Sequence, residues 1–211
     1  MKKLLLLFFI AISFHGFTQK IKLAEGNVSA LKGQKTINLE FTYDGVRVGK
    51  YANEKKYIDK KKADYNGKEP GKGDKWEKDW FNDRKGRFEP RFIESFILAG
   101  MTAKQDAQYS IVFNTTFIEP GFNVGVARRN AYIDGVAVLV ATNDKSKVLA
   151  RFTIDNAPGR IYGGYDFDTG LRIQEGYATA LFSHACAGSF CAQTEPRSLR
   201  MAAHENSEYG D

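Results

Sequence analysis

Histidine and cysteine, which often carry catalysis or bind metals, are scarce in this chain of 211 residues. It holds three histidines and two cysteines. His15 lies in a leading apolar segment, and His184 and His204 lie near the last residue. The sequence has no serine-nucleophile turn, zinc-protease helix or phosphate-binding loop. General acid–base chemistry would have to use carboxylates, lysine or tyrosine. We therefore name no catalytic residue and expect no cofactor.

The two cysteines, Cys186 and Cys191, form a C-x4-C pair close to the end of the sequence. In an oxidising compartment such a pair can close a small disulfide loop, and this is the pairing we predict. His184 lies two residues before the first cysteine, which makes zinc an alternative. Three potential ligands without a clear fourth, and without C-x2-C spacing, do not make a convincing zinc site. We predict no metal.

Long apolar runs are also missing, apart from one at the start. Residues 4–14 are mostly apolar, follow Lys2 and Lys3, and precede small or polar residues around Thr18. This is the layout of a secretory signal peptide, and the run is too short to span a bilayer comfortably. We predict cleavage near Thr18 and a periplasmic or outer-membrane-associated product without a transmembrane segment. An uncleaved anchor is the alternative. No lipoprotein-type cysteine follows the run.

An unopposed basic stripe, which nucleic-acid binding requires, is not present. The formal charge of +6 is mild. Most of the excess lies within residues 50–91, where 14 lysines and arginines are interleaved with 9 acidic residues. Interleaved signs are typical of solvated helix faces. We predict no nucleic-acid partner and at most a weak attraction to anionic lipid or glycan.

Period-two alternation predicts strands in four segments. They are residues 35–49, 109–119, 131–142 and 148–155. In the second we expect one apolar face, made by Tyr109, Ile111, Phe113, Thr115 and Phe117. The third is almost continuously apolar, as in a central strand. Short connections between the last three predict an antiparallel meander.

Helical spacing predicts helices between the first two strands and after the last. Asn53 is a plausible N-cap and Gly67 a plausible end of one helix. Asp74 with Glu77 resembles a capping box for the next. Pro90 should kink or restart that helix. The apolar side of this region is expected to contain Trp76, Trp80, Phe81, Phe88, Phe92 and Phe96. A last helix should be capped by Asp168 or Thr169. We predict an α+β fold in which helices pack on one face of an antiparallel or mixed sheet.

Two glycine-containing connections are the candidate contact surfaces. The pattern of residues 117–135 predicts a long hairpin connection or a bent, glycine-kinked ribbon. Residues 160–168 form a second loop rich in aromatic and charged residues. Arginine on such loops can bind phosphate or carboxylate groups, although exposed arginines are common and usually have no binding role. The candidate partner-binding residues are Phe122, Arg128, Arg129, Arg160, Tyr162, Tyr165 and Asp166.

Pairs of aspartates offer an enzymatic alternative. Asp79 and Asp83 are one helical turn apart, and Asp166 and Asp168 are alternate residues in a loop. Cleavage of a glycosidic bond needs two carboxyl groups that face each other across a cleft. Helix capping and solvated ion pairs account for the same residues without catalysis.

Several long phrases of the sequence, among them "KTINLEFTYDGVRVG", "GDKWEKDWFNDRKGRFEPRF" and "NAYIDGVAVLVATNDKSKVLARFTID", resemble a family of uncharacterised secreted proteins from Gram-negative bacteria. The resemblance covers residue 19 to about residue 180. More remotely, the order of elements is similar to accessory domains of small envelope lipoproteins. The resemblance implies export and an α+β sheet, and it brings no catalytic residues. The missing lipoprotein cysteine and the segment after Ala180 depart from the family pattern.

These observations predict a signal peptide over residues 1–18, one α+β domain over residues 19–181 and a loosely ordered tail over residues 182–211. The predicted function is noncatalytic binding of an envelope protein or a cell-wall component. A carbohydrate-active or other hydrolase that uses the acidic residues, and a small-molecule carrier, are the alternatives.

Overall fold

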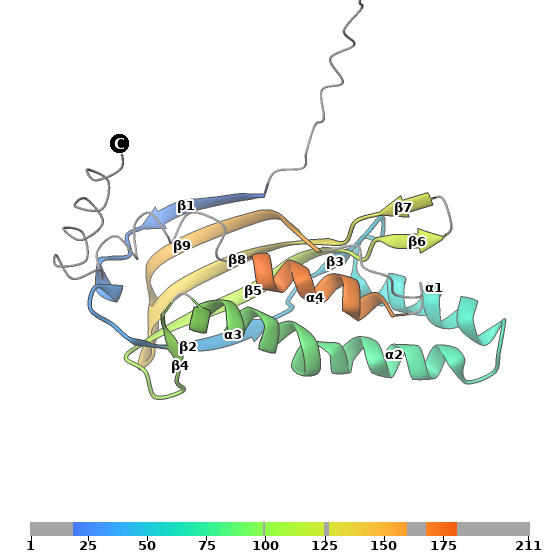
Figure 1. Cartoon of the computed structure of the whole chain (residues 1–211), viewed down its shortest axis with the longest axis horizontal. Coiled ribbons are helices and arrows are strands. Elements are labelled where there is room, and N and C mark those ends of the chain that lie inside the picture. Colours follow the sequence, from blue (N-terminus) through green and yellow to red (C-terminus); the bar gives the residue numbers. More distant parts are fainter. Residues whose placement is uncertain (1–18, 99, 125–126, 160–167, 181–211) are drawn as a thin grey trace, which may run out of the picture.

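A curved β-sheet with helices on one face forms the body of the protein (Figure 1). The computed structural model describes residues 19–98, 100–124, 127–159 and 168–180. The strands of the main sheet follow the order β1-β9-β8-β5-β2-β4, and β3 pairs with β5 beyond β2. Their bounds are β1 Lys20–Gly26, β2 Thr36–Thr42, β3 Arg47–Val48, β4 Thr102–Ala103, β5 Tyr109–Glu119, β8 Tyr132–Ala141 and β9 Asp144–Pro158.

The centre of the sheet is the predicted antiparallel meander. β5 pairs with β8, β8 pairs with β9, and β1 continues the antiparallel pattern on the outer side of β9. β2 and β3 run parallel to β5, because the chain passes through three α-helices and a π-helical turn before it returns to the sheet. The mixed sheet confirms the predicted α+β class.

The helices begin and end largely where local sequence signals place them. α1 (Glu54–Asn66) has Asn53 as its N-cap, whose side chain accepts a hydrogen bond from the Lys56 amide at 3.0 Å. α4 (Thr169–Thr179) is capped by Asp168, which accepts from the Leu171 amide at 3.1 Å. A short 3₁₀ turn, η1 (Ser29–Leu31), follows β1. Both predicted N-caps are confirmed.

The capping box predicted at Asp74 is wrong. α2 (Lys72–Asp83) starts earlier, after Gly71, whose φ is +83°. The Gly73 amide donates to the side-chain oxygen of Asn66 at 2.7 Å, so the last residue of α1 satisfies an amide in the first turn of α2. Asp74 and Glu77 instead form ion pairs with Lys62 at 2.9 and 2.7 Å.

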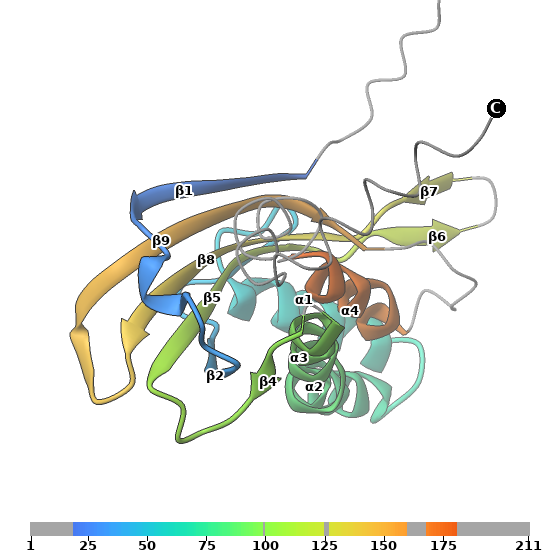
Figure 2. The ribbon, with the colours of Figure 1, turned by 60° about the vertical axis from the view of Figure 1, so that its left-hand side comes forward.

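The predicted break near Pro90 is a change of helix type. A π-helical turn, η2 (Arg84–Phe88), joins α2 to α3 (Glu89–Leu98), and Pro90 occupies the second position of α3. The residue before it, Glu89, is helical and donates to the Arg84 carbonyl, so Pro90 lies within a continuous helical run. Proline cannot extend the α-helical hydrogen-bond ladder, and the change to π-helical geometry falls immediately before it. Figure 2 shows α2 and α3 one behind the other beneath the sheet, with α4 beside them.

Aromatic side chains fill the space between these helices and the sheet. Phe88 stacks on Tyr177 of α4 at 4.8 Å between ring centroids, and Phe92 lies 4.7 Å from Phe113 of β5. The predicted core positions Trp76, Trp80, Phe88, Phe92 and Phe96 are all buried. Phe81 is 44% exposed, so its predicted place in the core is wrong. It follows Trp80 on the helix and points away from the buried side.

Phe117 also departs from its predicted face. The β5–β8 register shifts between Thr115 and Phe117, so one extra residue enters β5. Such a bulge reverses the side-chain alternation beyond it. Ile118 is therefore buried at 1% exposure, and Phe117 lies on the face of the sheet opposite the helices.

Candidate binding surfaces

The connection between β5 and β8 folds as the bent ribbon that its glycines predict. β6 (Phe122–Val124) pairs with β7 (Ala127–Arg129) in an antiparallel register that places Phe122 opposite Arg129. Gly121 starts the ribbon with a φ of +62°, and a Cβ there would lie 2.5 Å from the carbonyl oxygen of Arg129. Only glycine allows this approach. The ribbon extends beyond the main sheet at the end where α1 lies (Figure 1).

Arginines on the ribbon are exposed and weakly engaged. Arg128 is exposed, and the side chain of Arg129 is 63% exposed. The Arg129 guanidinium lies 5.9 Å from the Phe122 ring centroid and 3.5 Å from a carboxylate oxygen of Glu119. Val124, in the same ribbon, is 57% exposed. We call Phe122, Val124, Arg128 and Arg129 the ribbon surface.

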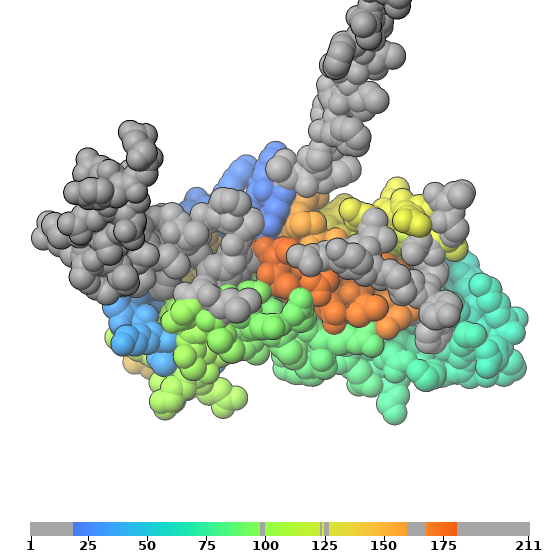
Figure 3. Space-filling view, viewed as in Figure 1, coloured from blue at the N-terminus to red at the C-terminus, as the bar shows by residue number. Residues whose placement is uncertain are grey.

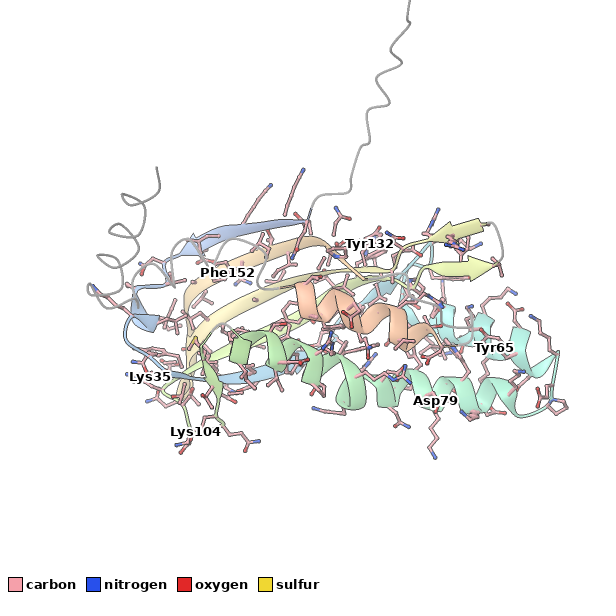
Figure 4. All side chains as sticks on the ribbon, viewed as in Figure 1. Lys35, Tyr65, Asp79, Lys104, Tyr132 and Phe152 are labelled. Atoms are coloured by element: carbon pink, nitrogen blue, oxygen red, sulfur yellow. The ribbon has the colours of Figure 1, made fainter. Side chains whose placement is uncertain are left out.

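The neighbouring end of the sheet adds aromatic rings and a further arginine. Phe117 and Tyr132 are adjacent on β5 and β8, with ring centroids 5.5 Å apart. The exposed Arg47 of β3 lies over Phe117 at 5.4 Å, a cation–π contact. Burial and the nearby Asp134 raise the pKa of Tyr132. Figure 4 labels Tyr132 at the sheet, on the side away from α2.

Sequence reasoning did not place Arg47, Phe117 and Tyr132 on a common surface. Arg47 reaches Phe117 only because β3 pairs in parallel with β5, a contact between segments that no local pattern connects. Phe117 turns to this face only because of the bulge. Of the predicted partner-binding residues, the structure places Phe122 opposite Arg129, and Arg128 pairs with Asn123 on the alternate face of the same ribbon. Arg160, Tyr162, Tyr165 and Asp166, and the predicted cysteine pair Cys186 and Cys191, lie outside the described residues.

The aspartates of the enzymatic alternative line a cavity of about 410 Å³ between α2 and the first turn of α4. Asp79 is paired with Lys75 at 2.6 Å. Asp83 and Asp168 both bind Arg87, the former at 3.0 Å. Burial raises the pKa of Asp83 to about 6, and the Arg87 charge opposes this. Asp166 lies outside the described residues.

Carboxylates from two elements thus meet in one cavity, but a guanidinium lies between them. Asp168 is also occupied as the N-cap of α4. An acid and a base for glycosidic cleavage need free carboxyl groups on opposite sides of the substrate. Among the residues that the structure describes, no three histidine, cysteine, aspartate or glutamate side chains are grouped so that they could hold a metal ion.

Comparison with known proteins gives structural neighbours only. No protein-family model matches the chain, and no curated protein matches it. The solved neighbours include two crystal forms of the PelC dodecamer from Paraburkholderia phytofirmans. One has 12% identity and a TM-score of 0.37, covering 78% of this chain and 96% of that chain. The other, a variant, has 12% identity and a TM-score of 0.36, covering 77% and 99%. Similarity at this level supports no inference about function.

Membrane-spanning helices and the base of the ribbon are the two remaining features. In the part of the chain that the structure describes, no helix is both long enough and apolar enough to cross a bilayer. The buried Arg172 of α4 donates to the carbonyl oxygen of Pro120 at 3.2 Å. Because Pro120 immediately precedes the ribbon, this bond ties the base of the ribbon to a helix on the other side of the sheet.

Proposed function

We propose that this protein is a noncatalytic, envelope-associated domain that binds an acidic protein or cell-wall partner through the ribbon surface and the adjoining Arg47, Phe117 and Tyr132. Export by a signal peptide over residues 1–18 is part of the proposal, as is membership of the secreted family that the sequence resembles. The observation that carries it is the exposed pair Arg128 and Arg129 on a ribbon held in place at its base.

The composition of the surface supports contact with carboxylate or phosphate groups. Arginine binds such groups with two parallel hydrogen bonds, and an arginine that lies over an aromatic ring is already oriented. Arg47 and Arg129 both lie over phenylalanine rings. Glu119, the nearby acid, also accepts a hydrogen bond from the Gly121 amide at 3.1 Å, so it supports the ribbon as well as facing Arg129.

Site-specific photocrosslinking in intact cells tests the proposal. A photoreactive residue is placed at Val124, and the matched control carries it at Leu23 of β1, which is also half-exposed and apolar at 49%. We expect a discrete crosslinked partner from position 124 and none from position 23. Equal products from both positions, or none from either, would contradict the proposal.

Charge reversal at the ribbon arginines provides a second test of the proposal. Arg128→Glu with Arg129→Glu should reduce crosslinking from position 124 by about tenfold or more, because two attractive contacts become repulsive. Lys20→Glu with Lys22→Glu makes the same change of charge on exposed residues of β1 and should have no effect. Mass spectrometry of the product distinguishes a protein from a cell-wall polymer. Unchanged crosslinking by the arginine variant would refute the assignment of the ribbon.

A further inference from the structure

The cavity between α2 and α4 has an aromatic base and a polar rim. Trp76 and Trp80 line it, with ring centroids 5.5 Å apart and an interplanar angle of 29°. Both are almost wholly buried, at 2% and 3% exposure, so they form the base of the cavity and present no open ring face to it. Figure 4 labels Asp79, a rim residue, on the side of α2 away from the sheet, and Figure 3 shows this region of α2 and α4 at the surface of the protein. The volume of about 410 Å³ lies within the usual range of small-molecule sites.

The rim carries both hydrogen-bond donors and acceptors. Lys75 and Arg87 donate, Asp79, Asp83 and Asp168 accept, and the amide of Asn82 does both. Every carboxylate there already has a cationic partner, but a carboxylate has about four acceptor positions. The rim can therefore accept hydrogen bonds from hydroxyl groups and also donate to them.

Thr169 shows that the hydrogen bonds of this cavity are incomplete. It lines the cavity at the first position of α4 and is 3% exposed. Its hydroxyl is buried and has no hydrogen-bond partner in the described part of the chain. Buried hydroxyl groups in folded proteins are nearly always paired, and an exception needs an explanation. A ligand hydroxyl in the cavity would supply the partner.

The same groups exclude other ligand classes. Three aspartates against the two cations Lys75 and Arg87 leave the rim with a net negative charge, which opposes an anion. The charged rim also opposes a purely apolar molecule. A bare metal ion is not favoured, since the described acids are not grouped as a coordination site. A neutral sugar matches these features, because its hydroxyls both donate and accept hydrogen bonds. We propose that the α2–α4 cavity binds a neutral saccharide unit. This site is separate from the ribbon surface.

Tryptophan fluorescence tests this proposal directly, because the two tryptophans of the chain both line the cavity. The full-length mature protein is titrated with glucose, galactose, N-acetylglucosamine and their β-1,4-linked disaccharides, and with glucuronate as the anionic comparison. We expect a saturable change with at least one neutral sugar and weaker binding of glucuronate. The absence of any saturable change with all neutral probes would overturn the proposal.

Thr169→Val separates a ligand contact from a structural role, with Thr153→Val on the opposite face of the sheet as the matched control. Valine keeps the shape and removes the unpaired hydroxyl. We expect the saccharide Kd to rise about tenfold, as for the loss of one buried hydrogen bond, while Tm without sugar stays equal or rises. An unchanged Kd would overturn the proposal. If Thr169→Val does not fold, Asp79→Asn at the exposed rim serves instead, and an unchanged Kd there has the same meaning.

Discussion

Removal of the Glu54 carboxylate should reveal how the start of α1 is fixed to the π-helical turn. Glu54 accepts two hydrogen bonds from the Arg84 guanidinium, at 2.5 and 2.7 Å, and one from the Trp80 indole at 2.7 Å. The two charged side chains are 16% and 20% exposed. Arg84 also lies 4.1 Å from the ring centroid of Tyr43 and 5.0 Å from that of Phe81. Glu54→Ala leaves a largely buried guanidinium and an indole N–H without their acceptor.

The expected cost follows from these contacts. Breaking a fully buried ion pair by removing one partner costs about 3–5 kcal/mol. Because this pair keeps some solvent contact, and the indole also loses a bond, we expect Glu54→Ala to lower the free energy of unfolding by about 2–4 kcal/mol. Glu54→Gln keeps an acceptor for the indole and should cost about 1–2 kcal/mol.

Urea unfolding, followed by tryptophan fluorescence and by circular dichroism, measures these values. Adding Arg84→Met to Glu54→Ala should cost less than the sum of the single changes, with a coupling energy of about 1–3 kcal/mol. Asp59→Ala is the matched control on the same helix, since the Lys55–Asp59 pair is 81% and 59% exposed and should contribute under about 0.5 kcal/mol. Equal effects of Glu54→Ala and Asp59→Ala would refute the reasoning.

Three further expectations concern single positions. Thr115→Val removes the 2.8 Å hydrogen bond to the buried Tyr177 hydroxyl and should cost about 1–3 kcal/mol in urea unfolding; a neutral effect would show that the phenol has another partner. Gly170→Ala places a Cβ 1.8 Å from an Asp83 carboxylate oxygen and should destabilise the protein by about 1–2 kcal/mol. Gly86→Ala, whose Cβ meets nothing within 4 Å, should be neutral or stabilising. A higher urea midpoint for Gly170→Ala than for Gly86→Ala would contradict the structure. Because the pKa of Asp83 is raised to about 6 in the folded state, the folded protein binds more protons than the unfolded chain between about pH 4 and 6, and stability falls as pH rises through that window. After allowance for solvent screening, Asp83→Asn should remove about 1–2 kcal/mol of this dependence, and identical pH profiles of the variant and the wild type would refute it.

Local signals predicted the elements whose stability is local. The cap at Asn53 and the phenylalanine stripe of η2 and α3 depend on residues within one or two turns of each other. β5 was predicted in full from its alternation, although its partners β2 and β8 are distant in the sequence. The α+β class followed from the change between periods of two and about four. The cap at Asp74 failed because the competing acceptor, Asn66, comes from the preceding helix.

Three features that depend on strand pairing were not predicted. Nothing in residues 20–26 shows that they form β1, since the strand is almost wholly exposed and its pairing with β9 supplies the order. The bulge after Thr115 inserts a residue without any glycine or proline to mark it. The ribbon arginines were predicted, but Arg47 and Tyr132 join them only through the sheet register.

The pairing of β1 also sets an order of events when the chain is made. Lys20 lies opposite Asp155, and Gly26 lies opposite Ala150, so the first strand to be synthesised has one of the last as its partner. Until β9 has emerged and joined β8, residues 20–26 have no template on which to become a strand. The β1 edge of the sheet therefore forms after the β8–β9 pair. An interruption of synthesis before residue 150 leaves residues 20–26 without a partner strand.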